Sequence, residues 1–223
     1  MRLVELFGPE GISVGNKPVA KNIEPPKTKE LGRGIDASAF DHPTRPGSVI
    51  KIVRDISNPE KHPQVVFTNL AIENKHNPFF PKIYQAKLMP IGKRYEMVIE
   101  MEKLHPITGK NIRHMIPHIF EQLGIDPKNI KKIVGAGITS PKYDTDEKIK
   151  DKADDEFARN INTWRSRERM MKYSQNPEFK EALNILKQWE NNFHYDLHAG
   201  NWMFRLTSVG PNLVLLDPFR DIP

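Results

Sequence analysis

The sequence predicts an α+β fold in two lobes, with an antiparallel sheet and one helix in the first lobe and mostly α structure in a shortened second lobe. Three observations lead to this prediction. Strand-like segments bounded by glycine and proline turns fill residues 31–104. Capped, helix-like segments dominate residues 105–190. One further apolar segment, PNLVLLDPF, is typical of a short buried strand that ends in an aspartate.

The 223 residues suit one compact domain or two small lobes. We expect residues 1–30 to be an extended lead-in, because NKPVAKNIEPPKTKE is rich in proline and lysine and lacks periodicity. We expect residues 31–104 to form the sheet lobe and residues 105–223 to form the helical lobe.

The first lobe is expected to contain two strands, one helix and two more strands. The four predicted strands are ELGRGIDASAF, GSVIKIVRD, KIYQAKLM and RYEMVIEMEKL, joined in pairs by the turns DHPTRPG and PIGK. The helix is expected within residues 59–75, where Val66, Leu70 and Glu73 recur at helical spacing. Pro78 and Pro81 prevent it from continuing.

The second lobe contains several helix-like segments with recognisable ends. KNIRHMIPHIFEQLG stops at Gly124, DPKNIKKIVGAG has Asp126 as its cap, and a long stretch near residues 153–173 follows. The clearest helix is NPEFKEALNILKQWENN, in which Asn176 is the cap and Pro177 is the first helical residue. Its apolar stripe consists of Phe179, Leu183, Leu186 and Trp189.

Composition excludes several classes of function. The sequence has no cysteine, which excludes disulfides, thiolate metal sites and cysteine nucleophiles. No apolar run approaches the roughly 20 residues that cross a bilayer, and the first residues lack a secretory pattern, so we expect a cytoplasmic protein without membrane contact. The net charge of +6 suits nucleic acids or nucleotides alike. Because zinc-finger spacing and basic-aromatic alternation are absent, nucleotides are favoured over nucleic acid.

Three oxygen-bearing side chains come late in the chain, in NNFHYDLHAGNWMF and LLDPF. Asp196 and Asn201 lie on a tight loop after a helix, and Asp217 ends the predicted buried strand. Carboxylate and amide oxygens suit Mg²⁺, which keeps some of its waters and shares ligands with phosphate groups. This set therefore indicates a nucleotide-binding metal site.

The first lobe contains what a triphosphate would need. Gly32 and Gly34 lack side chains, so backbone N–H groups there can approach phosphate oxygens closely. Lys51 on the following strand would add a cation.

The order of these residues resembles the protein-kinase-like fold: glycine-rich loop, strand lysine, helix, hinge strand, helices, an H-x-D-x-x-x-x-N loop and a strand-end aspartate. The resemblance spans about residues 31–219. The segments LGRGIDASAFDHP, VIKI, PKIY, DLHAGNWMF and LLDP are similar to the serine/threonine protein kinases of T7-like phages, which act early in host takeover. The resemblance implies an ATP- and Mg²⁺-dependent kinase that modifies host proteins in the host cytoplasm.

The resemblance also implies a role for each residue. Asp196 would orient the substrate hydroxyl and accept its proton, while Asn201 and Asp217 would hold Mg²⁺. Lys51 would grip the α- and β-phosphates, and Glu73 is the best-placed acid to pair with it.

The same resemblance implies an adenine site in the segment MVIEMEKL. The backbone of Glu100, Met101 and Glu102 would bind the adenine edge. Met101 and Val49 are among the expected walls of the pocket.

Several departures from the pattern leave alternatives open. Ala37 replaces the third glycine, and Tyr195 replaces the arginine that pairs with a phosphorylated activation segment. Pro218 restricts the backbone after Asp217, so we expect a fixed aspartate. His198 in DLHAGN is closer to small-molecule kinases of the aminoglycoside and choline types, which keeps a metabolite substrate as an alternative.

Only six residues follow Asp217, so the activation segment and the helical subdomain that holds peptides are expected to be missing. Substrate would then be held by residues 105–190, by the lead-in or by a partner. A kinase-like binding or inhibitor protein without transfer activity is the third reading.

Overall fold

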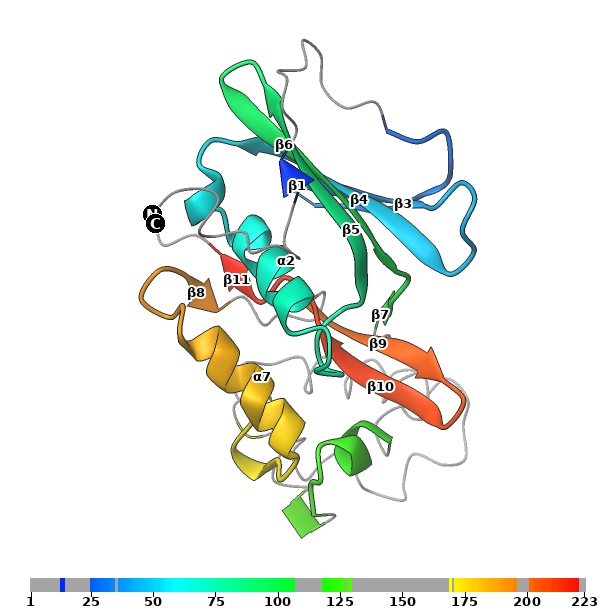
Figure 1. Cartoon of the computed structure of the whole chain (residues 1–223). Coiled ribbons are helices and arrows are strands. Elements are labelled where there is room, and N and C mark those ends of the chain that lie inside the picture. The colour runs from blue at the N-terminus through cyan, green and yellow to red at the C-terminus, as the bar shows by residue number, and fades with distance from the viewer. Residues whose placement is uncertain are drawn as a thin grey trace, which may run out of the picture. The chain divides into compact units, whose positions relative to one another are not determined.

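The computed structural model describes residues 13–14, 25–34, 36–106, 118–126, 128–129, 169, 171–195 and 201–220, and these form a mixed α+β structure (Figure 1). The chain divides into two compact units. The first unit comprises Met1–Lys103, Glu190–His194 and Phe219–Pro223, and the second comprises Leu104–Trp189 and Tyr195–Pro218.

A six-stranded sheet forms the first unit, in the spatial order β1-β5-β6-β4-β3-β2. The strands are β1 (Ser13–Val14), β2 (Glu30–Arg33), β3 (Ala37–Asp41), β4 (Ser48–Ile56), β5 (Ile83–Ile91) and β6 (Arg94–Glu102). Neighbouring strands are antiparallel except for β1, which runs parallel to β5. From β4 to β6 the order of strands and helix agrees with the prediction, and the turn at Gly92 joins β5 to β6 as expected. Strand β1 was not predicted, because residues 1–30 were expected to be an extended lead-in.

One predicted strand is in fact two strands. The segment ELGRGIDASAF forms β2 and β3, which fold back on each other as an antiparallel hairpin. The backbone N–H of Gly34 donates to the carbonyl of Ala37 across 2.7 Å, and this bond closes the turn. Glycine has no side chain to pack, so a single strand that ran through both glycines would gain little from packing there. Folding back instead lets β2 and β3 form ladder hydrogen bonds with each other.

Helix α2 (Pro63–Glu73) follows the short 3₁₀ helix η1 (Pro59–Lys61) and contacts β5 and β11 (Figure 1). Every residue of α2 from Val65 to Ala71 is buried, so the helix is covered over most of its surface. Each large apolar side chain removed from water in this way contributes roughly 1.5–3 kcal/mol.

Aromatic rings join distant segments of the first unit. Phe67 of α2 meets Phe80 edge to face at 6.0 Å and Phe219 at 6.4 Å, measured between ring centroids. Phe219 also stacks on Phe193 at 5.3 Å. These contacts explain why the late strand β11 (Phe219–Arg220), which pairs with β8 (His194–Tyr195), belongs with the first unit.

In the second unit, the described residues include a three-stranded sheet and one long helix. The sheet has the order β10-β9-β7, with β7 (His105–Pro106), β9 (Trp202–Thr207) and β10 (Gly210–Leu215) all antiparallel. Strand β10 was expected. Strand β9 was not predicted, because the segment around Asn201 was interpreted as a tight loop after a helix.

The predicted start of the helix NPEFKEALNILKQWENN is confirmed, but the helix ends at Lys187, before Trp189. Asn176 accepts a hydrogen bond from the N–H of Phe179 at 3.0 Å, and α7 (Pro177–Lys187) begins with Pro177. Its stripe is buried at Phe179 and Leu186, while Leu183 is half-buried and Trp189 lies beyond the end of the helix.

The helix that precedes Gly124 ends as expected. Gly124 has φ +62°, its N–H donates to Glu121 and the next N–H donates to Phe120, which is a Schellman end. Asp126 accepts from the N–H of Lys128 at 2.9 Å, as a cap does. The remainder of the helices expected within residues 107–117 and 130–168 lies outside the described residues.

Candidate functional site

The glycine hairpin of the first unit has glycines that the fold itself does not require. Neither Gly32 nor Gly34 has a positive φ. A Cβ atom added at Gly32 would meet nothing within 4 Å, and one at Gly34 would meet only the carbonyl of Ala37, at an ordinary 3.7 Å. All four residues of β2 are exposed. The two positions therefore leave room for a ligand beside the backbone.

Lys51 lies in the same cross-strand row as Gly32. The register pairs Gly32 with Ala39, Ala39 with Lys51, and Lys51 with Ile99. Directly opposed residues share one face of a sheet, so Lys51 and the glycine position belong to the same face. Lys51 is only 8% exposed. In this row only Ala39 and Gly32 lie between Lys51 and the edge of the sheet, and their side chains occupy little volume.

Arg33, between the two glycines, belongs to the opposite face. A bulge at Leu31 shifts the register of β2, and Arg33 is paired with Ser38. Its guanidinium contacts Glu30 through two hydrogen bonds of 2.9 and 3.0 Å. These hydrogen bonds and the charge of Glu30 raise the pKa of Arg33. The cation that shares a face with the glycines is therefore Lys51.

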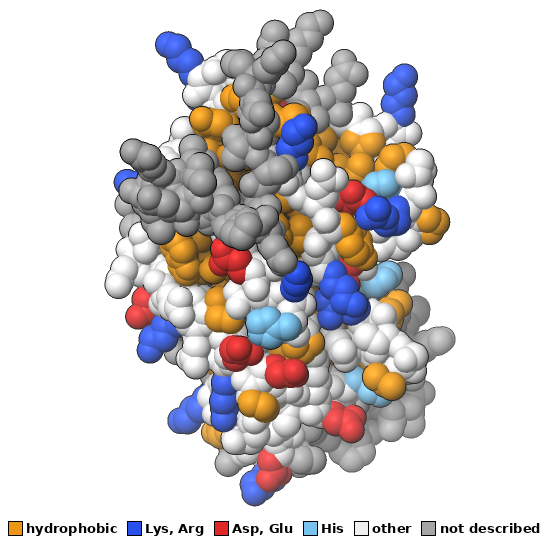
Figure 2. Space-filling model, in the orientation of Figure 1, with side chains coloured by type: hydrophobic (Ala, Val, Ile, Leu, Met, Phe, Trp, Pro, Cys, Tyr) orange, Lys and Arg blue, Asp and Glu red, His pale blue; other side chains and the backbone are white. Residues whose placement is uncertain are grey.

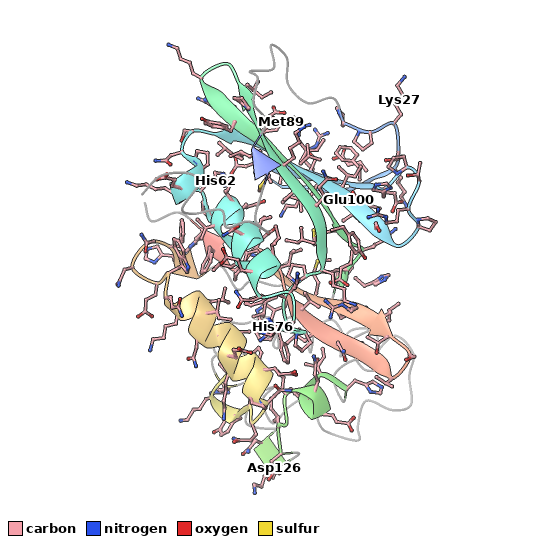
Figure 3. The ribbon with its side chains drawn as sticks, viewed as in Figure 1. Lys27, His62, His76, Met89, Glu100 and Asp126 are labelled. Atoms are coloured by element: carbon pink, nitrogen blue, oxygen red, sulfur yellow. The ribbon has the colours of Figure 1, made fainter. Side chains whose placement is uncertain are left out.

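The expected walls of the adenine pocket oppose each other across two strands. Val49 on β4 is paired with Met101 on β6, and both are buried. They alternate with Ile50 and Glu100, so they share the face of Lys51. The Glu100 side chain lies on the other face (Figure 3).

Backbone groups at the end of β6 are already engaged. The N–H of Glu102 donates to the carbonyl of Lys82 at 3.0 Å, and the N–H of Lys103 donates to Gly47 at 2.9 Å. The Glu102 side chain accepts in turn from the N–H of Lys82 at 2.7 Å. An adenine edge bound at Glu100–Glu102 would have to use other backbone groups than these two amides.

Asn201 and Asp217 lie at the same end of the β9–β10 hairpin in the second unit. Trp202 pairs with Leu215, and the N–H of Leu216 extends this ladder by donating to the carbonyl of Asn201 at 2.8 Å. Asn201 is buried, and Asp217 follows Leu216 directly. Phe179 of α7 packs edge to face on Trp202 at 6.3 Å, which supports this end of β9.

Asp217 has φ +47°, in the left-handed region that few non-glycine residues adopt. Asp55 is the other described non-glycine residue with a positive φ, at 60°. A positive φ costs a non-glycine residue conformational free energy, which the surrounding structure must offset. Such conformations are enriched at functional sites.

Several predicted site residues stand apart from these groups. Asp196 and His198 lie outside the described residues, and so does the side chain of Tyr195. Glu73 is exposed, and its carboxylate accepts from Asn69 at 2.7 Å, so its pairing with Lys51 stays a prediction. Within the part of the chain that the structure describes, His, Asp and Glu side chains form no group of three that could hold a metal ion.

Sequence reasoning missed a charged cluster around Glu100. The β3–β4 loop brings His42 and Arg45 to its carboxylate, and Arg45 lies over the ring of Tyr84. These residues are scattered over sixty positions without a motif, so only the register of the sheet reveals them. Figure 2 shows acidic, basic and histidine side chains interspersed over the described surface of one face.

The described helices include none that is long and apolar enough to cross a membrane. Comparisons of the chain with protein-family models, curated proteins and solved structures give no match. The family that the sequence resembles therefore stays a prediction.

Proposed function

We propose that this chain is an ATP- and Mg²⁺-dependent phosphotransferase that acts on protein hydroxyl groups, as the serine/threonine kinases of T7-like phages do. The observation that carries the proposal is the placement of Lys51, a buried cation on the same sheet face and in the same cross-strand row as Gly32. Phosphate oxygens are bound well by a cation together with backbone N–H groups that no side chain covers.

The first unit would bind the nucleotide. Backbone N–H groups near Gly32 and Gly34 would approach the phosphates, since neither glycine is needed by the fold. Lys51 would contact the α- and β-phosphates. Val49 and Met101, opposed on that face, would provide apolar contacts for the base.

Asn201 and Asp217 of the second unit fit Mg²⁺. Their amide and carboxylate oxygens are the hard donors that this ion prefers, and both residues lie at the same end of the β9–β10 hairpin. When bound, the ion would neutralise charge on the phosphate oxygens. Asp217 has a positive φ, a conformation that is enriched at functional sites.

The arrangement of the first unit also supports the proposal. The glycine hairpin, the lysine strand, the helix and the last two strands follow one another along the chain in the order that the resemblance implies. In the proposed reaction a substrate hydroxyl oxygen bonds to the γ-phosphorus while the bond to the bridging oxygen of ADP breaks. The hydroxyl proton passes to Asp196.

The test is transfer of labelled γ-phosphate from ATP to the protein itself or to proteins of a bacterial extract. Asp217→Asn is the informative variant, because asparagine tolerates a positive φ and only the charge is lost. Asp55→Asn is its matched control, since Asp55 is an exposed aspartate with a similar φ. We expect labelling by the unaltered chain and by Asp55→Asn, and its loss in Asp217→Asn and Asp196→Ala. Equal labelling in all four proteins would refute the proposal.

Two alternatives make different predictions in the same assay. The segment DLHAGN, with His198, favours a small-molecule kinase. Consumption of ATP with a small alcohol or aminoglycoside, and none with protein, would select that reading. A kinase-like binding protein would instead keep a stoichiometric protein partner when Asp196→Ala and Asp217→Asn are combined.

A further inference from the structure

Three polar side chains of neighbouring strands lie on the face of the first sheet that is opposite Lys51. Arg33 of β2 is paired with Ser38 of β3, and Ser38 is paired with Ile52 of β4. Arg54 follows Ile52 by two positions, so its side chain is on the same face. Its Nη1 atom lies 3.5 Å from the Ser38 hydroxyl oxygen, in agreement with this placement. Ser38 therefore stands in the middle strand, with an arginine on the strand at each side.

The Arg54 guanidinium has unused capacity for hydrogen bonds. A guanidinium carries five N–H groups, and the contact of 3.5 Å with Ser38 is at the long limit of a hydrogen bond. In the part of the chain that the structure describes, this is the one hydrogen bond of the Arg54 side chain, and neither Arg54 nor Asp36 of the nearby turn takes part in an ion pair. The backbone N–H of Arg54 donates to the carbonyl of Asp36 at 2.8 Å, which fixes the strand here. The fold thus holds a cation whose charge no described carboxylate neutralises.

The Ser38 hydroxyl is a buried donor without an acceptor. Ser38 is only 5% exposed, and its oxygen accepts the contact from Arg54. Among the residues that the structure describes, none accepts a hydrogen bond from the hydroxyl proton of Ser38. The large majority of buried hydroxyl groups have their hydrogen bonds satisfied, because a missing partner costs free energy. An anion bound between the two arginines would supply the acceptor.

Arg33 is the second cation of this group, and its present partner is an exposed carboxylate. It makes two hydrogen bonds of 2.9 and 3.0 Å with Glu30, and the two side chains are 71% and 36% exposed. Exposed ion pairs contribute little free energy, so an anion of higher charge can displace the carboxylate. Adjacent strands are about 4.8 Å apart. Each arginine therefore needs to span only one inter-strand distance to bind an anion that lies over Ser38.

We infer that Arg33, Ser38 and Arg54 form a binding site for a phosphate group, which is either free phosphate or the phosphate of a phosphorylated side chain. Guanidinium groups bind phosphate through paired, charge-assisted hydrogen bonds. Two of them and a hydroxyl group, presented by three adjacent strands, suit a tetrahedral anion better than a planar carboxylate. The site is on the opposite face of the sheet from Lys51, so it is distinct from the proposed nucleotide site and does not depend on the proposed function.

The test is a titration of the full chain with inorganic phosphate, followed by the side-chain Nε–H NMR resonances of Arg33 and Arg54. These resonances are assigned from the Arg33→Gln and Arg54→Gln variants and report this site alone. We expect saturable shifts of both resonances in the unaltered chain. Lys51→Met changes the other face, and Arg94→Gln removes an exposed arginine that is paired with Asp55. Both controls are expected to leave the dissociation constant within about twofold.

Three substitutions within the group are expected to have different effects. Arg54→Gln removes a charged donor, so phosphate binding at Arg33 should weaken by at least about tenfold. Ser38→Ala removes the hydroxyl donor and should weaken binding by about threefold, while thermal stability without phosphate stays the same or rises, because the lost proton had no acceptor. Glu30→Gln frees Arg33 and removes a competing charge, so phosphate should bind about threefold more tightly.

A second titration identifies the source of the phosphate group. The probe is a short glycine–alanine peptide with one phosphoserine, and the same peptide with serine is its control. If the site serves a phosphorylated protein, the phosphopeptide is expected to bind at least about tenfold more tightly than inorganic phosphate, because a peptide backbone adds contacts along the edge strand β2. Equal affinity of phosphopeptide and phosphate would select free phosphate as the ligand. Equal binding of the two peptides would overturn the role of phosphate.

The gain of affinity expected for Glu30→Gln cannot result from partial unfolding, so the inference stays testable even if Arg54→Gln proves unstable. Absence of saturable shifts in the unaltered chain would overturn it. A phosphate affinity that Arg54→Gln and Glu30→Gln both leave unchanged would overturn it as well. Thermal unfolding of each variant without phosphate shows whether the variant is folded at the temperature of the titration.

Discussion

Asn201 and Leu216 face each other across the open end of the β9–β10 hairpin, where the N–H of Leu216 donates to the carbonyl of Asn201 at 2.8 Å. This bond continues the ladder one step beyond the pair Trp202 and Leu215. Asp217 comes next and turns into the left-handed region. The hairpin thus places an amide and a carboxylate, sixteen residues apart in sequence, at the same end of one structural element.

The conformation of Asp217 predicts how its substitutions affect stability. Asparagine adopts a positive φ readily, so Asp217→Asn is expected to change the free energy of unfolding by less than about 0.5 kcal/mol. Alanine does not, and Asp217→Ala is expected to lower it by about 1–2 kcal/mol. Both variants lose the carboxylate, and phosphate transfer should fall at least about a hundredfold in each. Urea unfolding and the labelled-ATP assay measure the two effects separately.

The outcome that would count against this explanation is equal stability of the Asp217→Asn and Asp217→Ala variants. The same pair of substitutions at Asp55, also at positive φ, provides a control for the backbone effect without a site.

The glycine hairpin predicts a separation of binding from stability. Because a Cβ at Gly32 meets nothing within 4 Å, Gly32→Ala is expected to leave stability unchanged or to raise it slightly. The added methyl group would hinder the approach of phosphate, so ATP affinity should fall about tenfold if the backbone there binds phosphate. Gly92→Ala is the control: Gly92 has φ +59°, so this variant should lose about 1 kcal/mol of stability. Nucleotide titration and thermal unfolding decide between these effects, and unchanged ATP affinity in Gly32→Ala would exclude a phosphate role.

Much of the first unit could be predicted from local sequence signals. Glycine and proline turns bound the strands, and the alternation in RYEMVIEMEKL indicates a strand with one apolar face. The end of the 118–122 helix at Gly124 and the start of α7 at Asn176 follow from capping chemistry, which acts over three or four residues. Signals of this range are visible in a single sequence.

Features that depend on pairing between distant residues could not be predicted. The hairpin within ELGRGIDASAF depends on register, and the sequence alone favoured a single strand. Strand β9 begins within the segment NNFHYDLHAGNWMF, whose polar residues Asp196 and Asn201 favoured the interpretation as a loop. The contact of His42 with Glu100 joins residues far apart in sequence, and only the antiparallel order of β3, β4 and β6 brings them together.

Two hydrogen bonds join Lys82 and Glu102, so we expect the Glu102 side chain to stabilise the pairing of the start of β5 with the end of β6. Its carboxylate, 6% exposed as a residue, accepts from the N–H of Lys82. Glu102→Ala would leave that N–H without its acceptor and is expected to cost about 1–3 kcal/mol. Glu102→Gln keeps an acceptor oxygen and should cost less than about 1 kcal/mol. Urea unfolding measures both, with the exposed Glu73→Ala as a control on the same unit. Similar losses in Glu102→Ala and Glu102→Gln would show that charge, and not the accepted hydrogen bond, matters.

The Asn176 side chain makes two hydrogen bonds, and we expect three substitutions that remove different ones to lower stability by different amounts. Its Oδ1 accepts from the N–H of Phe179 at 3.0 Å, and its Nδ2 donates to the carbonyl of Gln122 at 2.7 Å. Asn176→Ala removes both and is expected to lower stability by about 1–2 kcal/mol. Asn176→Ser keeps the cap alone and should lose less. Asn176→Asp also keeps the cap, but it sets a second oxygen against the Gln122 carbonyl, so it should be less stable than serine despite its favourable charge at a helix start.

This ranking of alanine, aspartate and serine separates the two roles of Asn176, because a cap acting alone would make aspartate at least as good as serine. The measurement is urea unfolding of the three variants, with Lys187→Ala at the exposed end of α7 as the control. Helix α7 precedes Asp196 in the chain, and Asn176 stands at the start of that helix, the end farther from Asp196 in sequence. Phosphate transfer measured well below the unfolding temperature is therefore expected to stay within about twofold of the unaltered chain in Asn176→Ser. A large loss of transfer without a loss of stability would show that the start of α7 acts on the site directly.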